Sequence, residues 1–171
     1  MKTYLTFAIP LLLALVMLPA AWLWWDQGSD AHPDAALADA DSDSLLVFMS
    51  PTCGCCGDWV DHMRENGFEA ETRETDTVNA IKEEAGLPRD LVSCHTAFIG
   101  GYLIEGHVPA GDVQRLLEER PDAAGLSVPR MPIGSPGMEI QGEGRDEFDV
   151  VLFHEDGSRE VFNHYPAMNS L

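Results

Sequence analysis

The pattern of apolar and polar residues first sets apart the N-terminal end of the chain. Residues 5–25 carry no charge and almost no polar side chain, and they end in a tryptophan-rich stretch just before Asp26. As a helix this run would be about 31 Å long, enough to cross the hydrocarbon core of a membrane. With Lys2 on the cytoplasmic side and the tryptophans at the opposite interface, residues 1–25 are predicted to form a membrane anchor.

A cleaved signal peptide is the alternative interpretation of the same segment. Ala36-Leu37-Ala38 offers small residues at the spacing of a cleavage site, although it lies rather far beyond the apolar run. Both interpretations deliver the rest of the chain outside the cytoplasm. Residues 26–44 are acidic, rich in Ala, Asp and Ser, and lack an apolar period, which predicts a flexible linker.

Apolar periodicity from residue 45 onward predicts one folded α/β domain over residues 45–171. Strands are predicted at 45–49, 68–75, 96–99 and 102–105, and helices at 57–66, between Asp76 and Gly86, and at 109–120. Gly100-Gly101 suits a tight turn with positive φ between the last two strands. The order β-α-β-α-β-β-α is the thioredoxin-like arrangement, in which the first helix starts at the reactive edge of the sheet.

The periodicity weakens after this core of residues 45–121. Residues 126–144 are rich in Pro, Gly and Met without a period, and a loop of this length is expected to be functional or disordered. A last hairpin is predicted from 148–153 and 159–165 around Asp156-Gly157, and we expect it to extend the sheet or cover an edge. Residues 122–171 are therefore predicted to be a C-terminal extension made of a loop and a β-hairpin.

The composition excludes one large class of partner. The 171 residues carry 10 Lys+Arg against 29 Asp+Glu, a formal net charge of −19, and the sequence pI is near 4.3. A protein that binds phosphate backbones needs a basic face, so we expect no nucleic-acid partner. Four cysteines are too few for a disulfide scaffold in a chain of this length, so they indicate a chemical site instead.

Three of the cysteines lie between the first strand and the first helix. Cys53-Gly54-Cys55-Cys56 contains a C-x-x-C pair, Cys53 and Cys56, with a third thiol inserted at Cys55. Backbone N–H groups at the start of a helix favour the thiolate, which is the form that attacks disulfides and binds metals. Cys53 and Cys56 are therefore candidates for redox chemistry, and all three thiols are candidate metal ligands.

The fourth cysteine is predicted to reach the same place. Cys94 and His95 come just before the strand 96–99, which runs antiparallel to the first strand in a thioredoxin-like sheet, so both should face the cluster. The second strand of the hairpin returns to that edge and delivers His107 there. Weaker candidate ligands are the thioethers of Met131 and Met138 in the long loop, because thioether sulfur suits Cu(I).

The donor set favours copper. Soft thiolates select Cu(I), which accepts two or three sulfurs and lets one sulfur bridge two metals, whereas adjacent Cys55 and Cys56 are awkward for one tetrahedral zinc. A zinc site made of all four cysteines stays open as an alternative, as does a pair of structural disulfides in an oxidising compartment.

Three blocks of the sequence resemble the CopG-type periplasmic copper-resistance proteins, a metal-binding family long known as a domain of unknown function. The blocks are SPTCGCCGDWVDHM, SCHTAFIGGYLIEGHVPAGDVQRLLEERPDAAGLSVP and MPIGSPGME, in this order between residue 45 and about residue 140. The resemblance implies a thioredoxin-like fold in the periplasm that holds copper as a cysteine-bridged, multinuclear cluster, with redox chemistry in copper handling. Carried over to this chain, the thiolate ligands are Cys53, Cys55, Cys56 and Cys94.

Three functions follow from these observations as hypotheses. The first is a periplasmic Cu(I)-binding protein for copper resistance, anchored to the inner membrane or soluble, whose partners are copper ions and other periplasmic copper-handling proteins. The second is a metal-free thiol-disulfide oxidoreductase with Cys53 as nucleophile and Cys56 as resolving cysteine. Against it, the cis-proline segment usual in that class is replaced by residues 93–96. The third is a small domain that only uses disulfides to hold its fold.

Overall fold

The computed structural model describes residues 44–170, and in this part the chain forms a mixed α/β fold on one seven-stranded sheet. The strands are β1 (Leu45–Met49), β2 (Ala70–Glu74), β3 (Thr96–Ile99), β4 (Tyr102–Glu105), β5 (Gly125–Ser127), β6 (Phe148–Phe153) and β7 (Arg159–Tyr165). The helices are α2 (Gly54–Glu65), α3 (Val78–Glu84) and α4 (Ala110–Glu119), with a short 3-10 helix, η2 (Arg89–Leu91). The predicted order of elements up to α4 is confirmed.

The predicted anchor, residues 1–25, lies outside the described residues, as does the linker 26–44 apart from its last residue. Both stay predictions. Between residues 44 and 170, no helix is long and apolar enough to cross a membrane.

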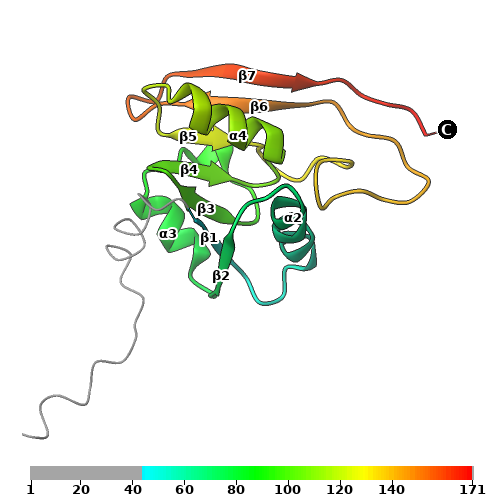
Figure 1. Ribbon diagram of the computed structural model, residues 1–171, viewed down its shortest axis with the longest axis horizontal. Coiled ribbons are helices and arrows are strands. Elements are labelled where there is room, and N and C mark those ends of the chain that lie inside the picture. Colours follow the sequence, from blue (N-terminus) through cyan, green and yellow to red (C-terminus); the bar gives the residue numbers. More distant parts are fainter. Residues whose placement is uncertain (1–43, 171) are drawn as a thin grey trace, which may run out of the picture. The chain divides into compact units, whose positions relative to one another are not determined.

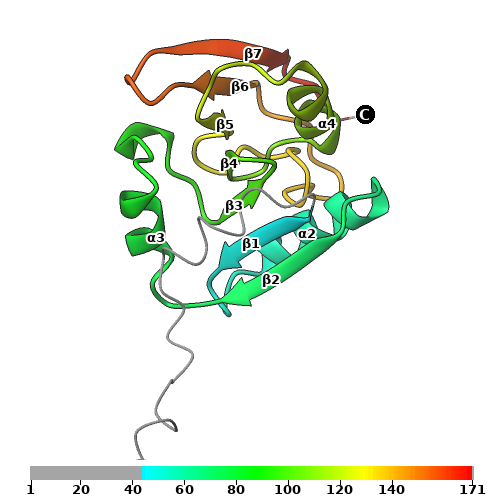
Figure 2. The same cartoon turned by 60° about the vertical axis from the view of Figure 1, so that its left-hand side comes forward.

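The side chains of β1 explain why helices cover both faces of the sheet. Leu45 and Val47 belong to the core on the side of α2 and α4, together with Trp59. Leu46 and Phe48 belong to the core on the opposite side, with the residues around α3. Figure 2 shows this arrangement, with α3 on one side of the sheet and α2 and α4 on the other. Because β1 is buried on both faces, its sequence is an uninterrupted apolar run.

The strand order β2-β1-β3-β4-β5-β6-β7 brings three strand ends together (Figure 1). β1 runs antiparallel to β3, with Phe48 opposite Thr96, and in the β3–β4 hairpin Thr96 lies opposite Glu105. The hairpin turn has positive φ at Gly100 (56°) and Gly101 (86°), as predicted. The end of β1, the beginning of β3 and the end of β4 therefore lie side by side, which is the convergence expected from the sequence.

The first helix begins earlier than predicted. It starts at Gly54 rather than at residue 57, so Cys55 and Cys56 lie in its first turn and Cys53 is the N-cap residue. Gly54 begins this turn although glycine has a low helix propensity. Burial of Cys56 on the inner face of the helix outweighs that propensity.

The start of the predicted loop 126–144 is a strand instead. β5 pairs parallel with β4 and antiparallel with β6, so the β6–β7 hairpin extends the sheet rather than covering an edge. Three residues are too short to show a period in the sequence. Gly125 permits the pairing, since a Cβ at this position would lie 1.8 Å from the carbonyl oxygen of Leu103.

We expect Gly125→Ala to separate β4 from β5. The added Cβ overlaps the backbone of Leu103 and not a flexible side chain, so the loss of stability should reach the upper part of the range of about 1–3 kcal/mol for overpacking. Gly111→Ala is the matched control, because Gly111 lies in α4 with open space around its Cα, and it should be neutral or gain up to about 1 kcal/mol. Urea unfolding measures both, and equal stability of the two variants would contradict the prediction.

Candidate metal centre

The four cysteines meet at the end of the sheet where β1 stops and β3 begins. Cys53, Cys55 and Cys56 come from the N-cap and first turn of α2, and Cys94 comes from the segment between η2 and β3. Their four Sγ atoms all lie within 4.8 Å of one another. Residues far apart in the sequence thus form a single cluster of sulfur atoms, which we call the cysteine cluster.

Two of these sulfur atoms are joined in the structure. Cys53 and Cys56 form a disulfide, while Cys55 and Cys94 are free thiols. The Sγ atom of Cys55 lies 3.6 Å from that of Cys53. In this state the cluster offers two thiols, and adding two electrons and two protons to the disulfide would provide four.

Two histidines lie on the other side of Cys94. The Sγ atom of Cys94 is 3.1 Å from Nε2 of His107 and 3.4 Å from Nδ1 of His95. On His107, Nδ1 lies 2.8 Å from the carbonyl oxygen of Pro136. A carbonyl only accepts, so Nδ1 carries the proton and Nε2 presents its lone pair toward Cys94. Cys94 is therefore shared between the cysteine cluster and a second possible ligand group, Cys94–His95–His107.

His95 is the most enclosed member of this group. It is fully buried, and its ring centroid lies 4.3 Å from that of Trp59 and 5.0 Å from that of His107. Its Nε2 has no hydrogen-bond partner among residues 44–170. An unpaired polar atom in a protein interior is costly, and it fits a site at which the imidazole gains a partner.

Burial sets the charge of the site. It lowers the pKa of His95 well below its usual value and also lowers the pKa of His107, so both imidazoles are neutral at pH 7. Burial, followed by the neighbouring Cys55, raises the pKa of the Cys94 thiol to about 11. A neutral imidazole is ready to bind a metal, whereas Cys94 must give up a proton to do so.

The long loop covers the start of α2. A Cβ on Gly137 would lie 2.7 Å from the backbone nitrogen of Trp59 and 2.9 Å from the carbonyl oxygen of Cys55, so the loop passes directly over the first turn of the helix. Together with the bond from His107 to Pro136, this contact shows that the loop is part of the wall of the site. Met138 lies half-buried in the same turn.

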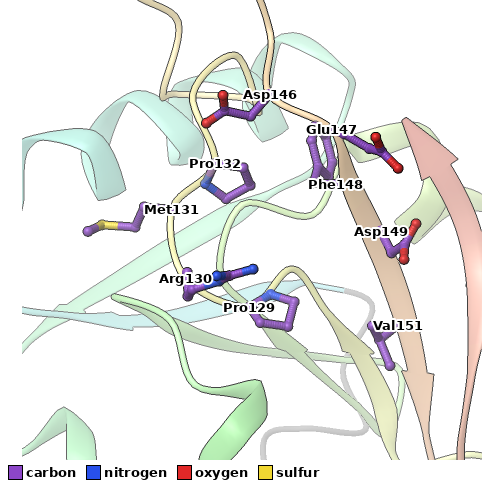
Figure 3. Close-up of a pocket in the computed structure, with 9 residues that line it drawn as sticks. All are labelled: Pro129, Arg130, Met131, Pro132, Asp146, Glu147, Phe148, Asp149 and Val151. Carbon is purple, nitrogen blue, oxygen red and sulfur yellow. The ribbon is translucent and has the colours of Figure 1, made fainter. Parts of the chain in front are cut away.

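Met131 lies in a different environment. It is 49% exposed and borders a groove of about 560 Å³ between residues 129–132 and the start of β6. Figure 3 shows its side chain pointing away from the acidic side chains of Asp146, Glu147 and Asp149. No cysteine lines this groove, so the structure gives Met131 no support as a ligand.

The structure also reveals a partner for Glu105 near the site, Lys82, which was not predicted there from the sequence. Lys82 and Glu105 form a buried ion pair next to the segment that carries Cys94. The signal available was a lysine within the apolar face of a helix, since Lys82 follows Ile81 and lies one turn beyond Val78.

The chain is similar to one family model and to two solved structures. A family model described as "Protein of unknown function, DUF411" matches residues 91–138. Two solved structures, "Copper resistance protein copG" in its Form 1 and Form 2, are each 41% identical to this chain with a TM-score of 0.68. They match 72% of this chain, and the matches span 97% and 98% of theirs. No curated protein sequence matches.

The raised pKa of Cys94 predicts how its reactivity depends on pH. In the metal-free folded protein, the rate of alkylation at Cys94 should keep increasing up to about pH 11. The thiol of the unfolded chain has its ordinary pKa of 9.0, so its rate should level off at a lower pH. At pH 8 this difference makes alkylation about 10- to 100-fold slower than in urea. Peptide mass spectrometry after timed alkylation measures the rate at Cys94.

The same shift has a consequence for stability. Because the unfolded thiol ionises first, folding stability should fall as the pH rises from about 9 toward 11. Cys94→Ser removes the group and should flatten this part of the stability profile. A midpoint for Cys94 alkylation below pH 9 in the folded protein would contradict the assignment.

Proposed function

The chain belongs to the CopG-type copper-resistance family, and on that premise we propose that it binds Cu(I) in a multinuclear cluster of cysteine thiolates. The observation that carries the proposal is the convergence of four Sγ atoms within 4.8 Å of one another. Thiolates are the ligands that Cu(I) prefers, and sulfurs this close together can bridge neighbouring ions. The proposed ligands are Cys53, Cys55, Cys56 and Cys94.

Neutral imidazoles next to the cluster complete the proposed donor set. His107 directs the lone pair of Nε2 at Cys94, and His95 has a buried nitrogen without a partner among the described residues. Met138 remains a candidate because its turn packs on the first turn of α2, whereas Met131 is not proposed as a ligand.

The proposed function includes a redox step at the disulfide. Binding by four thiolates requires that the Cys53–Cys56 disulfide first accept two electrons and two protons from a dithiol reductant, which leaves as its own disulfide. Each thiol then releases its proton on binding metal. The state of this one bond therefore sets how many sulfurs are available to copper.

The proposed fold family is thioredoxin-like. Support comes from the first four strands, in the order β2-β1-β3-β4, and from the C-x-x-C pair at the start of the helix that follows β1. In such domains this helix start is the reactive position.

A thiol-disulfide oxidoreductase is the second candidate, and the Cys53–Cys56 disulfide is the observation that favours it. Two cysteines suffice for that reaction, with Cys53 as nucleophile and Cys56 as resolving thiol. Cys55 has no role in it, so this residue separates the two functions.

Cys55→Ser is therefore the decisive variant for the proposed function. We expect the reduced wild-type protein to bind several Cu(I) ions per chain. The variant should bind fewer ions, with an affinity for Cu(I) at least about tenfold lower. Removing the hydrogen-bond partner of a metal ligand already lowers metal affinity by this factor, and removing the ligand itself should cost no less. Anaerobic titration against a Cu(I) chelator, with metal analysis of the product, measures both quantities.

The matched control is His62→Gln. His62 lies on the same helix and is half-buried, but its Nε2 accepts a hydrogen bond from the backbone N–H of Ala110 at 3.1 Å, away from the cysteine cluster. This variant should keep the copper stoichiometry. Binding of a single zinc ion instead of copper, or turnover of a disulfide substrate that survives Cys55→Ser without copper binding, would refute the proposal.

In the proposed function the protein works in the periplasm, held to the inner membrane by residues 1–25 and exchanging copper with other periplasmic proteins. The sequence alone supports this location, through the apolar run 5–25 and the acidic linker that follows it. Fractionation and N-terminal sequencing of the mature protein test it. We expect an intact N-terminus in the membrane fraction, whereas a new N-terminus within residues 26–44 would show a cleaved signal.

A further inference from the structure

Side chains pair backbone groups of the segment that carries Cys94, in addition to the backbone bond from the N–H of Gly106 to the carbonyl oxygen of His95 at 3.1 Å. Residues 92–95 lie between η2 and β3 and belong to neither. The backbone N–H of Ser93 donates to Oε1 of Glu105 at 2.6 Å, and its carbonyl oxygen accepts from Nζ of Lys82 at 2.8 Å. Backbone groups without such partners would be left unpaired or free to move.

One carboxylate holds the chain on both sides of the two ligand candidates. Oε1 of Glu105 accepts from Ser93, and Oε2 accepts from the hydroxyl of Thr96. Cys94 and His95 are the two residues between these attachment points. The Glu105 side chain therefore fixes the segment from both ends, and Lys82 fixes the carboxylate by an ion pair.

Stability alone does not explain this pair. Lys82 is 2% exposed and Glu105 is fully buried, and both charges lose their hydration. An apolar pair of similar volume in such a place is often equally or more stable. What apolar side chains cannot provide is the set of directed bonds to Ser93 and Thr96.

The segment around Ser93 also packs closely against its neighbours in the fold. A Cβ on Gly106 would lie 2.5 Å from both the Cβ and the Oγ of Ser93. The Ser93 hydroxyl donates to the carbonyl oxygen of Arg130. The backbone N–H of Arg130 donates to the carbonyl oxygen of Val92 at 3.2 Å. The segment is thus enclosed by β4 on one side and by residue 130 on the other.

We propose that Lys82 and Glu105 are positioning residues, which fix the backbone at Ser93 so that Cys94 stays next to Cys55. Neither side chain forms a hydrogen bond with a sulfur atom of the cysteine cluster, and together they reach the segment through Ser93 and Thr96. The inference rests on the proposed function, because fixing Cys94 beside Cys55 would preorganise a metal site. The position of Cys94 can nevertheless be measured without metal.

The test compares Lys82→Met/Glu105→Leu with the wild type. Full-length protein purified without reductant keeps the Cys53–Cys56 disulfide, so Cys55 and Cys94 are its two thiols. Dibromobimane becomes fluorescent when it bridges two nearby thiols, and monobromobimane reports the reactivity of single thiols. The ratio of the two rates should fall about 10- to 100-fold in the variant, as expected for a displacement of order 1 Å in a proximity-dependent reaction.

A graded variant and a control keep the test specific. Lys82→Met/Glu105→Gln retains an amide oxygen that can accept from Ser93, so it should recover part of the bridging, and it serves as the test if the apolar variant does not fold. Asp112→Leu removes another buried carboxylate, whose partners Asn163 and Tyr165 lie on β7. It should lower stability while leaving the ratio unchanged.

Copper binding forms a separate arm. The reduced apolar variant should bind Cu(I) about 10- to 100-fold more weakly than the wild type, as is usual when the partner of a metal ligand is removed. A bridging ratio equal to that of the wild type in both pair variants, or an equal fall in Asp112→Leu, overturns the inference. If the wild type binds no Cu(I), the proposed function fails, while the bridging ratio still decides whether the pair positions Cys94.

Discussion

The antiparallel pairing of β3 with β1 is the constraint on which the site depends. It fixes Thr96 opposite Phe48, so the chain just before Thr96 arrives beside the chain just after Met49. The first of these segments carries Cys94 and the second carries the C-x-C-C motif. The apolar residues of β1 pack alternately into the two cores, so a shift of register by one residue would turn every side chain toward the wrong core. The core therefore enforces the register, and the register brings the four sulfur atoms together.

A site assembled in this way contains polar groups that the fold must hold in its interior. His95, Glu105 and His107 are fully buried, and Lys82 nearly so. Each is accommodated differently: His107 donates to Pro136, Glu105 accepts three bonds, and His95 keeps a nitrogen without a partner in the described part of the chain. Burial also raises the pKa of Cys94 to about 11, further above neutral pH. The metal-free site is thus neutral around Cys94, and a cation such as Cu(I) must displace a proton to enter it.

Much of this arrangement could be predicted from the sequence because it depends on periodicity and topology. The alternating order of strands and helices placed Cys94 and His107 at the end of β1, and the structure agrees. Other features depend on three-dimensional packing. The early start of α2 at Gly54 requires the buried face of Cys56, and β5 requires the close approach of Gly125 to Leu103. The ion pair of Lys82 and Glu105 joins residues that were assigned separately to a helix and a strand, and their common burial appears only when both pack on the same end of the sheet.

Two-electron reduction of the Cys53–Cys56 disulfide connects the two functions that the site could perform. With the Cys53–Cys56 disulfide closed, the free donors are Cys55, Cys94 and the two imidazoles, enough for a Cu(I) ion with two or three ligands. With the disulfide open, four thiolates are available and sulfurs can bridge several ions. In the proposed function, a reductant that opens the bond raises the capacity for copper, and an oxidant that closes it removes two ligands. Under this proposal thiol-disulfide exchange and copper binding are successive uses of one cluster, and Cys55 is the residue that only copper binding needs.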